Sequence, residues 1–123
     1  MTFFVNCNKN IMVVSETGDI INNKLRRLDS NYDPFAMDSV RGYLYYIQKF
    51  LLKKFSMTLW KASEVGETID RVLHMTHFND NLFFTAGINN TFYITMVNQS
   101  GVFHHKLVEY PNISTSIMIT SMP

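Results

Sequence analysis

Three short aromatic stretches recur along the chain, each inside a run of hydrophobic residues. They read Thr-Phe-Phe-Val at 2–5, Leu-Tyr-Tyr-Ile at 44–47 and Leu-Phe-Phe-Thr at 82–85. Their aromatic pairs begin at positions 3, 45 and 83, so the spacings are 42 and 38 residues. A second hydrophobic stretch and then a glycine follow each pair: 11–14 and Gly18, 57–60 and Gly66, 92–97 and Gly101. Self-similarity with a period near 40 residues predicts a repeated structural unit.

Each unit carries signals for four strands. A short segment ending in an aliphatic residue follows each glycine, at 24–28, 69–73 and 105–108, and a further segment comes before an aromatic pair at 34–38 and 74–78. Hydrophobic and polar residues alternate over 91–98, although not strictly, in the manner of a strand. Glycine and its polar neighbours predict turns at 16–19, 64–67 and 98–101.

The pattern therefore predicts an all-β chain of about three four-stranded, propeller-like blades that form an incomplete ring. We place the units at about 1–33, 34–73 and 74–110, and the start of a fourth at 111–123. One blade cannot bury both of its faces, so we expect aromatic residues to pack between neighbouring units. Each large aromatic side chain buries about 150–250 Å². These repeat-core aromatics are Phe3, Phe4, Tyr45, Tyr46, Phe83 and Phe84.

A helical interpretation competes with this one. Between 37 and 61 the hydrophobic residues Val40, Leu44, Ile47, Leu51, Phe55 and Leu59 recur at steps of three and four, which is typical of an amphipathic helix. The alternative fold is a small α+β domain with a helix near 37–61. Gly42 and several residues with poor helix propensity argue against it, and it leaves the threefold repeat unexplained.

The stretch 33–47, Asp-Pro-Phe-Ala-Met-Asp-Ser-Val-Arg-Gly-Tyr-Leu-Tyr-Tyr-Ile, resembles the start of a YWTD repeat, the class B repeat of low-density-lipoprotein receptors. In that pattern a proline, a small residue and an aspartate precede a glycine turn and the Tyr-Trp-Thr-Asp core. Here 44–48 and 82–86 stand at the core, with Phe or Tyr at the tryptophan position and no core aspartate. These degenerate repeats look more like those of sevenless/Ros-type receptor tyrosine kinase ectodomains.

The resemblance implies a six-bladed, extracellular propeller that serves as a receptor scaffold and binds a protein ligand. Three units do not close a ring, because propellers have about four to eight blades. We therefore expect this chain to be a fragment of a longer receptor, or, as the second choice, a protomer that closes its ring as a homodimer. The expected partners are a protein ligand or neighbouring propeller blades.

Composition narrows the function classes. Hydrophobic residues make up 46% and charged residues 17%, which is typical of a globular domain. The formal net charge of +1 gives no electrostatic case for nucleic acid, and we expect the lysines at 49, 53, 54 and 61 to be solvated. No apolar run approaches the ~18 residues that span a bilayer, so we expect no membrane insertion by this segment and no signal peptide within this chain.

No constellation for catalysis or for a cofactor stands out, so we expect a non-enzymatic protein without a cofactor or a metal. Cys7 has no neighbouring base and is expected to be a partly buried thiol. His74, His77, His104 and His105 are expected to be solvated or strand-edge residues, because no cysteine or glutamate completes a zinc site. Asp38 matches the aspartate of the family's first strand and is expected to be buried and to cap a turn.

Three sequons give candidate N-glycosylation acceptors at Asn89, Asn98 and Asn112. Together with the resemblance they favour an extracellular glycoprotein, a protein-binding or scaffold segment of a receptor ectodomain. Recognition is expected at inter-strand loops such as 29–33 and 87–90. The alternative is an intracellular, cytoplasmic α+β adaptor domain that binds a protein partner.

Overall fold

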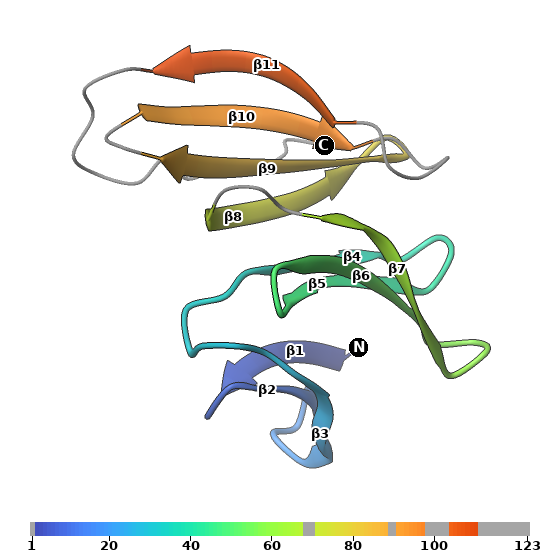
Figure 1. Ribbon diagram of the computed structural model, residues 1–123. Coiled ribbons are helices and arrows are strands. Elements are labelled where there is room, and N and C mark those ends of the chain that lie inside the picture. The colour runs from blue at the N-terminus through green and yellow to red at the C-terminus, as the bar shows by residue number, and fades with distance from the viewer. Residues whose placement is uncertain (1, 68–70, 89–90, 98–103, 111–123) are drawn as a thin grey trace. The chain divides into compact units, whose positions relative to one another are not determined.

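The computed structural model describes residues 2–67, 71–88, 91–97 and 104–110 (Figure 1). For residues 67, 88, 91–93 and 104–110 it describes the backbone only. Every regular element in these ranges is a β-strand, and all pairings between strands are antiparallel. The all-β prediction is confirmed, and the alternative of a helix near 37–61 is wrong, because that range holds strands and turns. The chain divides into two compact units, Met1–Asp33 and Pro34–Pro123.

The first unit is a three-stranded sheet in the order β1 (Thr2–Cys7), β2 (Asn10–Ser15) and β3 (Ile20–Arg27). A two-residue turn joins β1 to β2, and both of its residues, Asn8 and Lys9, have positive φ, as a type I′ hairpin turn requires. The expected turn at 16–19 is confirmed. Gly18 supplies its positive φ of 89°, and its N–H donates to the Ser15 carbonyl at 3.0 Å.

The second unit holds two four-stranded meanders. The first runs in the order β4 (Phe35–Asp38), β5 (Tyr43–Gln48), β6 (Leu51–Ser56) and β7 (Lys61–Glu67). The second comprises β8 (Arg71–Phe78), β9 (Asn81–Ile88), β10 (Thr91–Val97) and β11 (His104–Tyr110). Each meander begins with its first strand at one edge, and these two first strands, β4 and β8, contact one another.

The core of this unit lies between the two meanders. Because side chains alternate along a strand, Tyr45 and Ile47 of β5 share a face with Leu52 of β6, and this face packs against Met75 and Phe84 of the other sheet. The full cluster of buried residues is Ala36, Tyr45, Ile47, Leu52, Val72, Met75, Leu82, Phe84, Ala86 and Val97. Fully burying one such side chain contributes about 1.5–3 kcal/mol.

The aromatic pairs occupy similar positions in these two sheets. Counted from the first residues, Tyr43 of β5 and Asn81 of β9, Tyr45 corresponds to Phe83 and Tyr46 to Phe84. Counted from the last residues, Gln48 and Ile88, the pairs are offset by two residues, which leaves the faces unchanged. Tyr45 and Phe84 belong to the shared core. Neighbouring residues of a strand point to opposite faces, so Tyr46 and Phe83 point away from it. Each pair therefore places one ring on each face of its sheet.

In the first unit, the alignment of the aromatic pairs made from the sequence differs by one residue from the alignment of the strands. Cys7 directly precedes the two-residue turn after β1, as Gln48 directly precedes the turn Lys49-Phe50 after β5. Counting back from these turns, Phe4 corresponds to Tyr45, and Phe3 corresponds to Leu44. A shift of one residue exchanges the two faces of a strand, and Phe3 is 50% exposed although the sequence comparison matched it to the buried Tyr45.

One of the turns expected at glycines, at 64–67, lies elsewhere. Residues 57–60, which were expected to be strand, form the turn between β6 and β7, and Trp60 adopts its positive φ of 55°. Gly66 lies inside β7. As a result β8 begins at Arg71, so the expected unit boundary at 73/74 falls within this strand. The expected turn at 98–101 and the fourth unit at 111–123 lie outside the described residues.

Candidate functional site

Three turns lie at one end of the two meanders, at the right of Figure 1. They are the β4–β5 turn (39–42), the β6–β7 turn (57–60) and the β8–β9 turn (79–80), and we call them together the turn end. The first two are joined directly, because the Met57 N–H donates to the Gly42 carbonyl at 2.8 Å. Gly42, with a φ of 70°, gives the β4–β5 turn a left-handed residue at little steric cost.

Asp38 is the buried anchor of the β4–β5 turn. It ends β4, and only 1% of its surface is exposed. Its Oδ1 accepts hydrogen bonds from the backbone N–H groups of Val40 at 3.1 Å and of Arg41 at 3.2 Å. A short acidic side chain that bonds to the backbone ahead of it is a standard means of stabilising a turn. The expectation that Asp38 is buried and caps a turn is confirmed.

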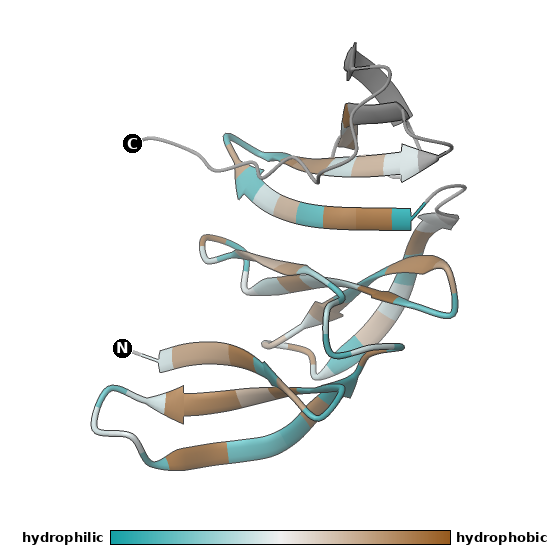
Figure 2. Ribbon diagram, turned by 90° about the vertical axis from the view of Figure 1, so that its left-hand side faces the viewer, coloured by the Kyte–Doolittle hydropathy of each residue, from teal (hydrophilic) through white to brown (hydrophobic). Residues whose placement is uncertain are grey.

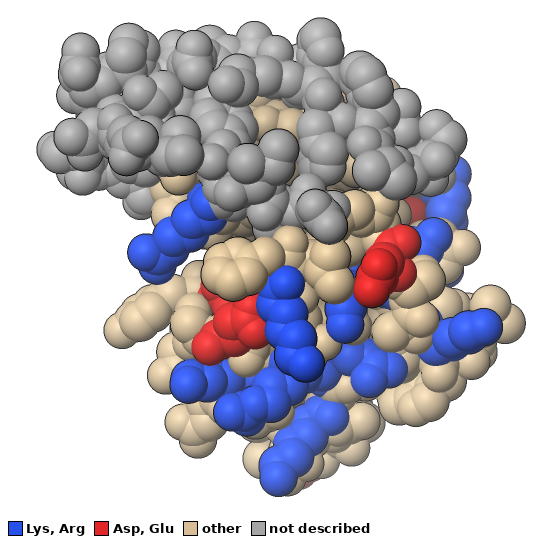
Figure 3. All heavy atoms as spheres, viewed as in Figure 1, with Lys and Arg blue, Asp and Glu red and all other residues tan. Residues whose placement is uncertain are grey.

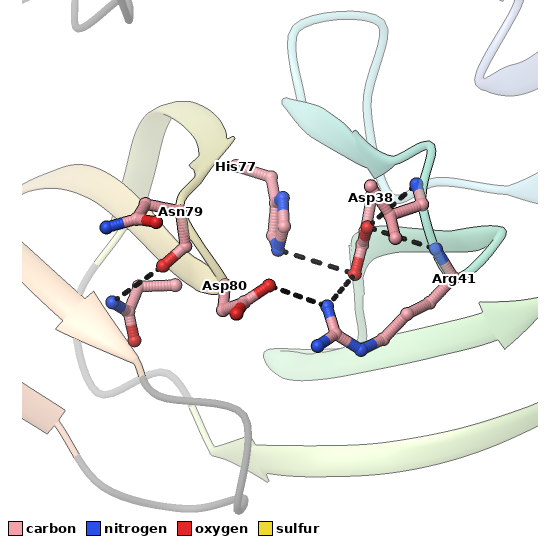
Figure 4. A network of polar contacts seen from close by, with 7 residues as sticks. Asp38, Arg41, His77, Asn79 and Asp80 are labelled. Carbon is pink, nitrogen blue, oxygen red and sulfur yellow. Dashed lines mark hydrogen bonds and ion pairs between the residues drawn. The ribbon is translucent and has the colours of Figure 1, made fainter.

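Arg41 connects this turn to the other sheet (Figure 4). Its guanidinium Nη1 lies 3.2 Å from Asp38 Oδ2 and 2.8 Å from Asp80 Oδ1. Asp80 belongs to the β8–β9 turn, 39 residues further along the chain, and its side chain is 66% exposed. An exposed ion pair contributes about 0.2–1 kcal/mol. The contact to Asp38 matters more, since losing one partner of a buried pair leaves an uncompensated charge.

His77 enters the same network from β8. Its imidazole is 10% exposed, and Nε2 lies 3.5 Å from Asp38 Oδ2. The ring stacks on Tyr45, with centroids 5.8 Å apart and planes inclined by 9°. His77 lies on β8, the edge strand of its sheet, but it is not solvated, because the packing of β8 on β4 encloses it. Its side chain and that of His74, three residues earlier, point to opposite faces of β8.

These contacts fix the ionisation of the buried groups. Burial raises the pKa of Asp38, but the hydrogen bonds from the Arg41 backbone and guanidinium, together with the charges of His77 and Arg41, outweigh burial, and the pKa of Asp38 lies below its ordinary value. The pKa of Tyr45 is raised, first by burial and then by the Asp38 charge. The bonds to Asp80 and Asp38 raise the pKa of Arg41. Asp38 is therefore anionic, Arg41 cationic and Tyr45 neutral at neutral pH.

Exposed hydrophobic side chains also lie at the turn end. Val40 is exposed in the β4–β5 turn, and Leu59 and Trp60 are exposed in the β6–β7 turn. Phe78, the last residue of β8, is also exposed. The Trp60 ring makes an edge-to-face contact with the ring of buried Phe55, with 5.0 Å between the ring centroids. We call Val40, Leu59, Trp60 and Phe78 the apolar rim. Tryptophan and arginine are the residues that most often dominate protein–protein binding energies.

The network was only partly accessible to sequence reasoning, which singled out Asp38 but not Arg41, Asp80 or the role of His77. One signal was available. Arg41 and Asp80 carry opposite charges in the corresponding turns of consecutive units, just before β5 and β9.

Other residues expected to matter lie apart from this network or outside the described ranges. The sequon asparagines Asn89, Asn98 and Asn112 lie outside the described residues, and for His104 and His105 only the backbone is described. Gly87, expected in a recognition loop, is inside β9. The loop 29–33 is held by Asn6, whose Nδ2 donates to the carbonyls of Ser30 and Asp33 at 3.3 Å each. Cys7 is exposed, so the expectation of a partly buried thiol is wrong.

Two of the lysines in the first meander contact neighbouring side chains. Lys53 donates from Nζ to Gln48 Oε1 at 2.8 Å, and Lys54 Nζ lies 4.5 Å from the centre of the Tyr43 ring. On the face shown in Figure 3, Lys and Arg side chains are spread over the described part of the chain with acidic ones among them.

Within the described ranges no three metal-ligating side chains gather as a candidate metal site. In the same ranges no helix has the length and apolar character to cross a membrane. No protein-family model matches the chain, and no curated protein matches its sequence.

Proposed function

We propose that this chain is a non-enzymatic protein-binding scaffold made of propeller-type blades, part of a YWTD-like receptor ectodomain. The observation that carries the proposal is the contact of β4 with β8, which sets two four-stranded meanders face to face with their first strands adjacent. That is the arrangement of consecutive propeller blades, whose first strands line the centre.

The turn end is the binding surface in this proposal. Asp38, Arg41 and Asp80 connect two of its turns, and contacts already made before binding reduce the conformational entropy that binding costs. The apolar rim adds exposed aromatic and aliphatic side chains at the same end of the two sheets. Tryptophan and arginine are enriched among the residues that dominate protein-binding energies.

The extracellular placement rests on the resemblance to YWTD repeats and on the three sequons. The α+β adaptor is not carried further, because the described fold is all-β.

Site-specific photo-crosslinking tests the binding surface. A photoreactive residue at Leu59, at the turn end, is compared with one at Phe50, an equally prominent residue in the turn at the other end of the same sheet. The proposal expects secreted or cell-surface proteins that crosslink from position 59 and not from position 50, and it expects the substitution Trp60→Asn to reduce their yield at least fivefold. Identical crosslinked proteins from both positions would contradict it.

A further inference from the structure

His77 is a buried titratable residue where β8 packs on β4, and the proposed binding surface makes no use of it. Its side chain is only 10% exposed, and its Nε2 has no hydrogen-bond partner among the described residues. This nitrogen lies 3.5 Å from Oδ2 of Asp38, so the two side chains point toward one another between the two sheets (Figure 4). A buried polar atom of this kind calls for an explanation.

The position of Nε2 determines which form of the ring suits the site. A lone pair on Nε2 would face the anionic carboxylate of Asp38 and be repelled, whereas an N–H group there is attracted to it. We therefore assign a hydrogen to Nε2. A second proton, on Nδ1, makes the ring cationic and leaves the N–H group that faces Asp38 in place.

The charges around His77 favour this cationic form. Asp38 and Asp80 carry two negative charges, and Arg41 supplies one positive charge to both of them through the same nitrogen. The group therefore has one negative charge in excess. An imidazolium at His77 extends it to a row of four alternating charges, in which each contact joins a cation to an anion. Opposite charges at such short distances favour the charged forms of both partners.

Few other ionisable groups face His77. Hydrophobic stretches alternate with hydrophilic ones along the strands (Figure 2), but β4 has no charged residue besides Asp38, and β9 has none. From β5, Tyr45 stacks on the imidazole, and Tyr43 lies beside the amine of Lys54. The alternating row therefore dominates the electrostatic surroundings of the ring.

The ionisation of Asp38 supports the same coupling. Burial raises the pKa of Asp38, while the hydrogen bonds from Arg41 and then the charge of His77 lower it. Coupling between two sites is reciprocal, so the anion of Asp38 favours the imidazolium of His77. Burial of the ring acts in the opposite direction, and the test below decides between the two effects.

We propose that His77 is a pH-sensitive contact between the two meanders, whose imidazolium binds Asp38 at mildly acidic pH and strengthens the packing of β8 on β4. The folded protein then takes up this proton more readily than the unfolded chain. Stability therefore rises as the pH falls from about 8 to about 6, where histidine titrates, and the gain is lost as the pH rises again. This property does not depend on what the turn end binds.

The folding equilibrium constant of the full chain at pH 8 and at pH 6 tests the proposal. Urea denaturation gives it for the wild type and for three variants. His77→Gln removes the titrating group, and Asp38→Asn removes the anion. His74→Gln is the matched control, because the side chain of His74 points to the opposite face of β8.

The expected result is an increase from pH 8 to pH 6 that is at least threefold larger in the wild type and in His74→Gln than in the other two variants. Equal increases in the wild type and His77→Gln would overturn the proposal, and so would an increase that Asp38→Asn retains. Hydrogen exchange of the wild type requires no variant to fold. The amides of β4 and β8 should have protection factors at least threefold larger at pH 6 than at pH 8, and unchanged or smaller factors would also overturn the proposal.

Discussion

The Arg41 guanidinium reaches from the β4–β5 turn to Asp80 of the β8–β9 turn, with 2.8 Å between Nη1 and Oδ1. The same nitrogen contacts Asp38, which is buried in the turn that Arg41 itself occupies. One cation thus joins the end of one sheet to the end of the next. The two carboxylates differ in their surroundings, because Asp38 is buried and Asp80 is exposed to solvent.

Substituting the two carboxylates should separate their roles. Asp38→Ala removes the acceptor for two backbone N–H groups and a guanidinium, so it should lower the free energy of unfolding by about 1–3 kcal/mol. Asp80→Ala removes only an exposed partner and should cost about 1 kcal/mol or less. Urea denaturation monitored by Trp60 fluorescence measures both. Equal costs for the two variants would show that Asp38 does not anchor the turn.

Stability should depend on pH through Asp38. Its pKa in the folded protein is below the ordinary value of 3.8, so the unfolded chain binds this proton more readily. The stabilisation is fully present above pH values near 3.8 and is lost as the pH falls through the lower, folded pKa. Urea midpoints measured from pH 7 downward should therefore fall below pH 4 more steeply for the wild type than for Asp38→Asn. Parallel curves for the two proteins would argue against this ionisation.

Much of the fold could be predicted from the sequence, because strands buried on both faces, such as β5, leave a continuous hydrophobic run, and these runs recur with a regular spacing. The all-β class followed from that repeat, and the buried role of Asp38 followed from the resemblance to YWTD repeats. The turns were harder to predict, because the prediction relied on the positions of glycines. Lys49-Phe50 and Trp60 adopt positive φ without glycine, so the β6–β7 turn was placed at Gly66 and the boundary before β8 was late. The pairing of Arg41 with Asp80 depends on how the two sheets pack, which no local pattern encodes.

Two substitutions in the turn Lys49-Phe50 should stabilise the fold. Both residues are left-handed, with φ of 53° and 61°, a conformation that costs residues with a β-carbon about 1–2 kcal/mol each. The double substitution Lys49→Asn with Phe50→Gly introduces the preferred type I′ pair and should raise the free energy of unfolding by about 1 kcal/mol. Chemical denaturation checks it. A destabilised variant would mean that the contacts of these side chains outweigh the backbone strain.

Secretion and N-glycosylation test the proposed extracellular placement. Expressed behind a heterologous signal peptide in a mammalian host, the chain should be secreted and should lose mass on treatment with an N-glycan-removing enzyme. Substituting Asn89, Asn98 and Asn112 by Gln, singly and together, identifies the acceptors. Secretion of a folded chain without glycan at any of the three would weigh against the extracellular assignment and leave the β-sheet description unaffected.

The packing of the two meanders against one another is the claim on which the proposed function depends. Methyl-labelled protein allows nuclear Overhauser contacts to be observed between side chains of the shared core. The account predicts contacts from Ile47 or Leu52 in one sheet to Val72 or Leu82 in the other. Contacts confined to residues within each sheet would contradict the stacked arrangement.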